Sequence, residues 1–214
     1  MKSPLSPILE DIETLPEAFK IQFLHSPELD YDVVLEGVLT EVWFRPIWLA
    51  PLFWLLERLG ILIAERANSI KTTLKVVAIY DENGFPYHLW FRRFYGAKVK
   101  KFDVKVIFDR ASKQAVDLVG LKGFLALAWD VRFAPPDTIK LDVVGAGIRY
   151  RDRIFWLPNW LWPIFLGREE FIQKVDFPKA DQVSIHLLIK HPLFGSVFSY
   201  KGTFQVTQHK EKND

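Results

Sequence analysis

The chain of 214 residues has no cysteine, a single methionine and little net charge. The absence of cysteine excludes disulfide bonds, thiolate metal sites and a cysteine nucleophile. Its 28 lysines and arginines are offset by 26 aspartates and glutamates, which leaves a net charge of +2. A strong positive field of the kind that attracts nucleic acid is therefore not expected, and we predict no nucleic-acid partner.

An uninterrupted membrane span is also missing. The stretch PIWLAPLFWLLERLGILIA, residues 46–64, carries Glu57 and Arg58 in its middle. A span needs about 20 apolar residues, and a charge at the bilayer centre costs about 3 kcal/mol. We interpret the segment as a helix over residues 51–66. Its predicted core face consists of Leu52, Leu55, Leu56, Leu59, Leu62 and Ile63. Trp54 and Ile61 project on the charged side, so a second protein layer, a lipid-like ligand or a membrane surface should cover them.

The first 19 residues place acidic side chains where a secretory signal would need an apolar run, so a cytoplasmic location is expected. Apolar residues recur at helical spacing over residues 6–25, which predicts one or two short helices broken at Pro16. The last residues, 208–214, are polar and are predicted to be a disordered tail. Between the ends no linker or repeat divides the chain, so residues 1–207 are expected to form a single domain.

Beyond Asn68 most segments alternate between apolar and polar residues. The clearest is 102–108, where Phe102, Val104, Val106 and Phe108 alternate with charged residues. Asn83 and Gly84 favour a tight hairpin turn, and short turns without long helices indicate antiparallel pairing. We predict an α+β fold in which about eight to ten strands form a long curved, barrel-like sheet. The N-terminal helices should pack on the sheet or cap it.

Motifs for known chemistry are scarce. VVGAGIRYRD, residues 143–152, resembles a dinucleotide-binding fingerprint, but position 150 is tyrosine and no helical pattern follows. A strand with Gly145 and Gly147 at a bulge or bend explains it better. The histidines lack metal-ligand spacing, and a structural hydrogen bond is the favoured role for His88. No metal or cofactor is expected.

Aromatic side chains and a few charges inside apolar strands are the candidate site. FWLPNWLWPIFLG, residues 155–167, holds several tryptophans between two prolines, an arrangement suited to the mouth of an apolar cavity or to a membrane interface. The candidate ligand-binding residues are Trp54, Trp90, Arg92, Trp129, Asp130, Trp156, Trp160 and Trp162. Arg92 could meet an anionic head group. Glu36, Asp130 and Asp142 interrupt apolar strands, and Arg92 or Arg132 could pair with them.

Three segments resemble a known family: LWFRRF with Trp90, Arg92 and Phe94; IFWLPNWLWP, residues 154–163; and HPLFGSVFSYKG, residues 191–202. They are similar to an uncharacterised bacterial domain of unknown function, family 4166, which occurs alone or behind a saccharopine-dehydrogenase-like module. The resemblance runs from LPEAF at Leu15 to the last strand. It implies an accessory domain and brings no reaction and no catalytic residue.

The leading functional hypothesis is a non-enzymatic domain that binds a hydrophobic or lipid-like small molecule between the curved sheet and the helix over residues 51–66. One alternative is an accessory module whose aromatic residues contact a membrane surface or a partner protein. The other is an enzyme that uses a pocket carboxylate or histidine, such as Asp130 or His88, as a general base. The sequence does not determine the oligomeric state.

Overall fold

The structure is a computed structural model that describes residues 3–9, 14–44, 50–63, 66–176, 179 and 181–210. Three short α-helices, α1 (Glu17–Phe23), α2 (Ala50–Arg58) and α3 (Trp162–Leu166), and a 3-10 helix, η3 (Leu121–Gly123), accompany one large sheet. Its strands are β1 (Asp32–Phe44), β2 (Ile70–Tyr80), β3 (Pro86–Tyr95), β4 (Val99–Asp109), β5 (Gln114–Val119), β6 (Leu125–Ala134), β7 (Thr138–Tyr150), β8 (Arg153–Trp156), β9 (Arg168–Val175), β10 (Gln182–His191) and β11 (Gly195–His209).

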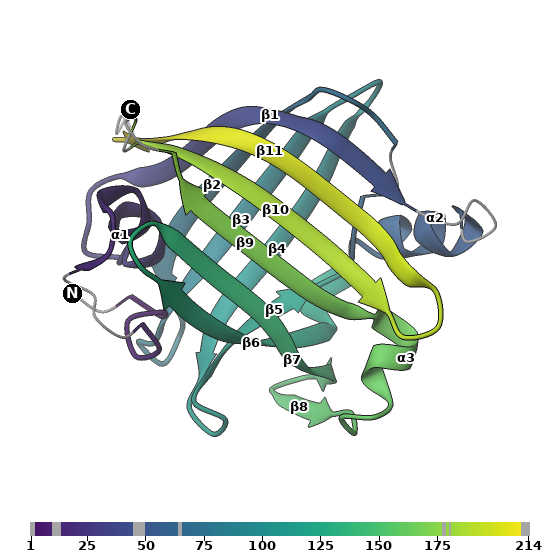
Figure 1. The fold of residues 1–214 in the computed structure, drawn as a ribbon. Coiled ribbons are helices and arrows are strands. Elements are labelled where there is room, and N and C mark those ends of the chain that lie inside the picture. Colours follow the sequence, from purple (N-terminus) through teal and green to yellow (C-terminus); the bar gives the residue numbers. More distant parts are fainter. Residues whose placement is uncertain are drawn as a thin grey trace.

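Ten of these strands close into an antiparallel barrel (Figure 1). The sheet order is β6-β5-β4-β3-β2-β1-β11-β10-β9-β7-β8, and β6 also pairs with β7, which closes the ring. β7 is shared along its length, because residues 138–142 pair with β9 while residues 147–150 pair with the short strand β8. The predicted α+β fold with a curved, barrel-like antiparallel sheet is confirmed.

The barrel strands follow the two-residue period of the sequence. On β4, Val104 and Val106 are buried while Asp103 is exposed on the other face. The predicted hairpin between β2 and β3 is present, with Gly84 at a φ of 76°. The Asp81 carboxylate accepts hydrogen bonds from the backbone N–H groups of Asn83 and Phe85 at 2.9 and 2.8 Å, which fixes the turn.

The glycine motif at 143–152 belongs to strand β7, as predicted. The register between β6 and β7 shifts where Ala128 pairs with Gly145 and Trp129 with Val143, so Val144 is the extra residue of a bulge. A side chain at Gly147 would come within 2.9 Å of Ile154 on β8. The glycine therefore allows the close approach of β8, and the strand continues to Tyr150 without the helix that a nucleotide site needs.

The prediction for the apolar segment was wrong in extent and only partly right in its buried face, since Ile63 is buried and Leu62 packs against the core. The helix α2 ends at Arg58, and Gly60 follows at a φ of 69°. Leu52 and Leu55, predicted to face the core, are 44% and 49% exposed, whereas Phe53 is buried. The Phe53 ring lies 4.9 Å from that of Phe44 and 6.2 Å from that of Phe198, so aromatic packing at the barrel rim sets the orientation of α2.

The other end of the barrel is closed by the N-terminal segment and α1 (Figure 1). α1 begins directly after Pro16, and its residues Phe19 and Phe23 are fully buried against the barrel end. Of the helices predicted over 6–25, the described residues show α1, a turn at residues 4–8 and 3-10 helical geometry at Thr14; residues 10–13 lie outside the described part of the chain. At the other terminus β11 extends to His209, two residues beyond the predicted domain boundary, and residues 211–214 lie outside it too.

Candidate functional site: a cavity inside the barrel

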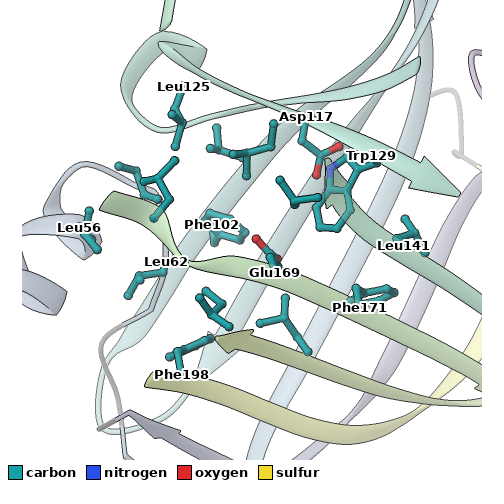
Figure 2. Close-up of a pocket in the computed structure, with 18 of the residues that line it drawn as sticks. Leu56, Leu62, Phe102, Asp117, Leu125, Trp129, Leu141, Glu169, Phe171 and Phe198 are labelled. Carbon is teal, nitrogen blue, oxygen red and sulfur yellow. The ribbon is translucent and has the colours of Figure 1, made fainter. Parts of the chain in front are cut away.

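The barrel encloses a cavity of about 360 Å³. Its walls are mainly leucine, valine and phenylalanine side chains from strands on all sides of the barrel (Figure 2). Among them are Phe102, Leu125, Leu127, Leu141, Phe171 and Phe198. A volume in this range is typical of small-molecule sites, which are usually apolar with a few convergent polar groups.

The cavity opens between α2, α3 and the turn that joins β10 to β11. Leu52 on α2, Ile164 and Phe165 on α3, and Phe194 in the turn all line the cavity. Their exposed fractions range from 43% to 68%, so each side chain faces both the cavity and the outside. Figure 1 shows α2 and α3 at the same end of the barrel, opposite α1. The mouth is therefore at the end away from the N-terminal cap.

Two groups of backbone and side-chain bonds hold this mouth in shape. The backbone N–H groups of Gly120 and Leu121 donate to the carbonyls of Gly60 and Leu59 at 3.2 and 2.9 Å, which ties the end of α2 to the β5–β6 connection. On the other side, His191 Nε2 lies 2.8 Å from the Ile164 carbonyl oxygen and connects β10 to α3. The two helices at the mouth are thus anchored to the barrel independently.

Among the described residues, four polar side chains line the cavity inside its mouth: Arg92 on β3, Asp117 on β5, Glu169 on β9 and Tyr200 on β11. Each occupies an inward position of its strand, because inward residues alternate along a strand. Asp117, for example, lies between the buried residues Ala115 and Val119. Figure 2 shows the carboxylates of Asp117 and Glu169 pointing into the cavity from different walls. The barrel therefore presents a charged group from several sides to one small space.

Burial shifts the protonation equilibria of this cluster. Burial raises the pKa of Glu169 to about 7, and the negative charge of Asp117 adds to the effect while Arg92 opposes it. Burial likewise raises the pKa of Asp117 to about 6. The charge of Arg92 and the neighbouring Trp129 indole N–H act in the opposite direction and lower this pKa. The pKa of Tyr200 rises to about 12, chiefly by burial. A carboxyl group with a pKa near 7 can donate or accept a proton at neutral pH.

Arg92 carries the one permanent positive charge among the described residues that line the cavity. Its guanidinium lies 5.3 Å from the Trp90 ring centre and 5.0 Å from that of Phe102, in the range of cation–π contacts. In the part of the chain that the structure describes, no lysine, arginine or histidine nitrogen comes within 4.0 Å of the Asp117 or Glu169 carboxylate. Arg92 thus acts on the two acids through its charge, without a direct ion pair.

Four of the eight predicted site residues line this cavity: Trp90, Arg92, Trp129 and Trp162. The other four, Trp54, Asp130, Trp156 and Trp160, lie outside it. Trp54 stacks with the Arg58 guanidinium at 4.8 Å on the outer side of α2, and Trp160 is 71% exposed before α3.

Asp130 and Asp142 are on the outer face of the barrel. Both form ion pairs with Arg132, at 3.0 and 2.5 Å. The pairing with Arg132 anticipated from the sequence is therefore confirmed, and these acids do not enter the cavity.

The sequence prediction missed Asp117, Glu169 and Tyr200. The signal for Asp117 was present in QAVDLV, where the acid takes an alternate position between Ala115 and Val119. Glu169 shares its face with Phe171 and Gln173 in the same way. Asp130 drew attention because it interrupts a longer apolar run, but it falls on the outward face.

His88 has the structural role predicted for it. Its side chain is fully buried at the closed end of the barrel, and its Nε2 lies 2.8 Å from the His25 carbonyl oxygen. Burial lowers the pKa of His88 to about 4, although this hydrogen bond partly offsets the effect. Within the described ranges, no three histidine, aspartate or glutamate side chains gather in a group that could hold a metal ion.

The fold and the cavity define a class: a closed antiparallel barrel with an internal apolar site. The family comparison adds to this class, because residues 15–204 match the family described as "Domain of unknown function (DUF4166)". The chain belongs to this family, as the sequence resemblance indicated. No curated protein matches the chain.

A solved structure with a similar arrangement carries the description "Crystal Structure of Rv2717c from M. tuberculosis". It is 11% identical to this chain, the alignment covers 92% of this chain and 99% of the other, and the TM-score is 0.40.

Among the described residues, no helix is both long and apolar enough to cross a bilayer.

Proposed function

We propose that the barrel is a binding domain for a hydrophobic small molecule. The observation that carries this proposal is the cavity of about 360 Å³ with apolar walls and a mouth between α2 and α3. Natural protein interiors are close-packed, and large voids are few. Leaving such a space open sacrifices packing contacts, and a bound apolar molecule would restore them.

The direct test is native mass spectrometry of gently purified protein, followed by solvent extraction of any bound molecule. Leu187 faces the cavity, while its neighbour Leu188 points to the other side of β10. Leu187→Trp should fill part of the cavity and remove the bound mass, whereas Leu188→Trp should leave it in place. A protein that carries no extractable ligand and binds no hydrophobic probe would contradict the proposal.

A second proposal concerns the surface around the mouth, which we infer contacts a membrane surface. Trp54, Leu55 and Phe165 are 55%, 49% and 68% exposed, and they extend the apolar lining of the cavity to the outside. Exposed apolar patches next to a cavity often mark a surface of interaction, and a ligand from a bilayer would meet this rim first.

Liposome flotation tests this surface. Trp54→Ala and Phe165→Ala should reduce flotation, while Phe85→Ala should not, because Phe85 is an exposed aromatic residue in the β2–β3 turn at the opposite end. Trp162 is unsuitable for this test, since it is buried and its loss would disturb the fold. Equal flotation of all three variants and the wild type would contradict membrane contact through the mouth.

A further inference from the structure

The charged groups on the cavity wall are unequal in number. Among the described lining residues, one guanidinium, Arg92, is accompanied by two carboxylates, Asp117 and Glu169. This part of the wall is therefore short of one positive charge when all three groups are ionised. The other lining residues that the structure describes are apolar apart from Tyr200 and, at the mouth, His191. An uncompensated buried charge is costly, and it is stabilised by a partner of opposite sign.

The geometry leaves space for that partner inside the cavity. Asp117 and Glu169 approach from different walls, and their carboxylates point into the same open volume (Figure 2). The Arg92 guanidinium is held against the rings of Trp90 and Phe102. Across the described residues no cation of the protein lies within 4.0 Å of either acid.

We propose that the ligand is an amphipathic amine whose protonated amino group lies between Asp117 and Glu169 and whose apolar body extends toward α2 and α3. This inference rests on the proposed function, because it specifies the chemistry of the molecule in the same cavity. An ammonium group would form charge-assisted hydrogen bonds with both carboxylates. The apolar walls between the acids and the mouth would enclose the rest of the molecule.

The same charges disfavour the opposite head group. An anion would add a third negative charge beside a single guanidinium, and it would bind only after one or both acids had taken up a proton. This reverses the expectation from sequence that Arg92 meets an anionic head group, because that expectation did not include Asp117 and Glu169. A neutral alcohol would find hydrogen-bond partners but would leave the charge imbalance unchanged.

Binding of an amine should therefore depend on pH. The groups that face Glu169 are Asp117 from β5, Arg92 from β3 and Tyr200 from β11, with His191 nearer the mouth. In the free protein the pKa of Glu169 is about 7, so the carboxyl group is largely protonated at pH 6 and ionised at pH 8. An alkylamine remains protonated throughout, since such groups titrate near pH 10. Its affinity should rise about tenfold between pH 6 and pH 8 from Glu169 alone.

Isothermal titration calorimetry with three ten-carbon probes, decylamine, decanol and decanoate, tests the inference below their micelle-forming concentrations. At pH 8 decylamine should bind about tenfold more tightly than the other two, as expected when a neutral hydrogen bond is replaced by a charge-assisted one. Tightest binding of decanoate, or equal binding of decanol and decylamine, would overturn the amine proposal and leave the hydrophobic site intact. If none of the three binds, the proposed function itself fails.

A pair of neighbouring variants identifies the acid responsible. Glu169→Gln should weaken decylamine binding about tenfold, leave decanol binding unchanged and remove most of the pH dependence. Glu170→Gln is the matched control, because Glu170 lies on the other face of β9, near Lys190. Unchanged decylamine affinity in Glu169→Gln would contradict the placement of the amino group. Circular dichroism would establish that both variants are folded.

Discussion

At the end of the barrel covered by α1, the buried side chains of Gln173 and His88 are hydrogen-bonded to the N-terminal segment, whereas the acidic side chains of the cavity have no ion-pair partner. Gln173 donates to Gln22 at 2.7 Å, and His88 is held by the His25 carbonyl. Arg92, Asp117 and Glu169 form no ion pair with one another within 4.0 Å. The first set holds the N-terminal segment in place, and the second set is the one that we propose contacts a ligand.

The two regions also respond to pH in opposite directions. Burial favours the neutral form in both, so the pKa of the histidine falls and the pKa values of the acids rise. Low pH should therefore reduce the folding stability through His88 at the closed end. High pH should reduce it through the ionised acids of the cavity. These two groups together favour the folded state most near pH 6, where His88 is neutral and Glu169 is largely protonated.

The largest expected difference between the two ends concerns aromatic packing. Phe19 on α1 is fully buried, while Phe165 at the mouth is 68% exposed. Phe19→Ala should reduce the free energy of unfolding by about 3–5 kcal/mol, and Phe165→Ala should change it by less than about 0.5 kcal/mol. Urea denaturation monitored by tryptophan fluorescence measures both. Similar losses in the two variants would show that the mouth is packed as tightly as the closed end.

The next largest effect is a gain in the folding stability of the ligand-free protein when Glu169 is replaced by glutamine. The pKa of Glu169 is raised from 4.5 to about 7, so the unfolded chain binds fewer protons than the folded one between these values and stability falls as the pH rises through that window. Glu169→Gln removes this penalty and should stabilise the ligand-free protein by about 3 kcal/mol at pH 8. At pH 4 the effect should vanish.

Thermal unfolding at the two pH values measures that gain, with Glu170→Gln as the control. The control residue lies 3.5 Å from Lys190 on the outside of the barrel, so its substitution should change stability little at either pH. A gain of the same size at pH 4 and pH 8 would show that the carboxylate charge is not responsible.

His88 should give a somewhat smaller effect of opposite sign. Its pKa is lowered from 6.5 to about 4, so the unfolded chain takes up a proton that the folded chain refuses, and stability is lost as the pH falls from 6.5 toward 4. Between pH 7 and pH 4.5 the wild type should lose about 2 kcal/mol relative to His88→Gln, which does not titrate. Urea denaturation at each pH measures the free energy of unfolding of both proteins. An equal loss in the two would exclude His88 as the acid-sensitive group.

The sequence predicted the strands better than it predicted their partners. Alternation along 102–108 depends on each strand alone, and Asn83 with Gly84 is a local turn signal, so both features were correctly read. Closure of the ring requires β1 to pair with β11, which places Asp32 opposite His209 although the two residues are far apart in the sequence. No local pattern specifies such a contact, although a sheet of this size was expected to curl.

The site was only half predictable for a similar reason. Arg92 and Trp90 stand out in LWFRRF, and both do line the cavity. Which acids accompany them depends on which face of each strand turns inward, and short strands such as β5 show this weakly. The apolar segment gave the opposite difficulty, because nearly every residue of α2 is apolar and the helical period could not distinguish Phe53 from Leu52 as the buried one.

The smallest effect separates the stability of the mouth from its function. Leu52 lines the cavity yet is 44% exposed, so Leu52→Ser should change the free energy of unfolding by less than about 0.5 kcal/mol. The same change removes apolar contact with a bound molecule and should weaken decanol binding about fourfold, the equivalent of one buried methylene group. Calorimetry and urea denaturation on the same sample measure the two quantities. A loss of stability above about 1 kcal/mol would show that α2 packs Leu52 against the barrel in solution and that the mouth is closed when the cavity is empty.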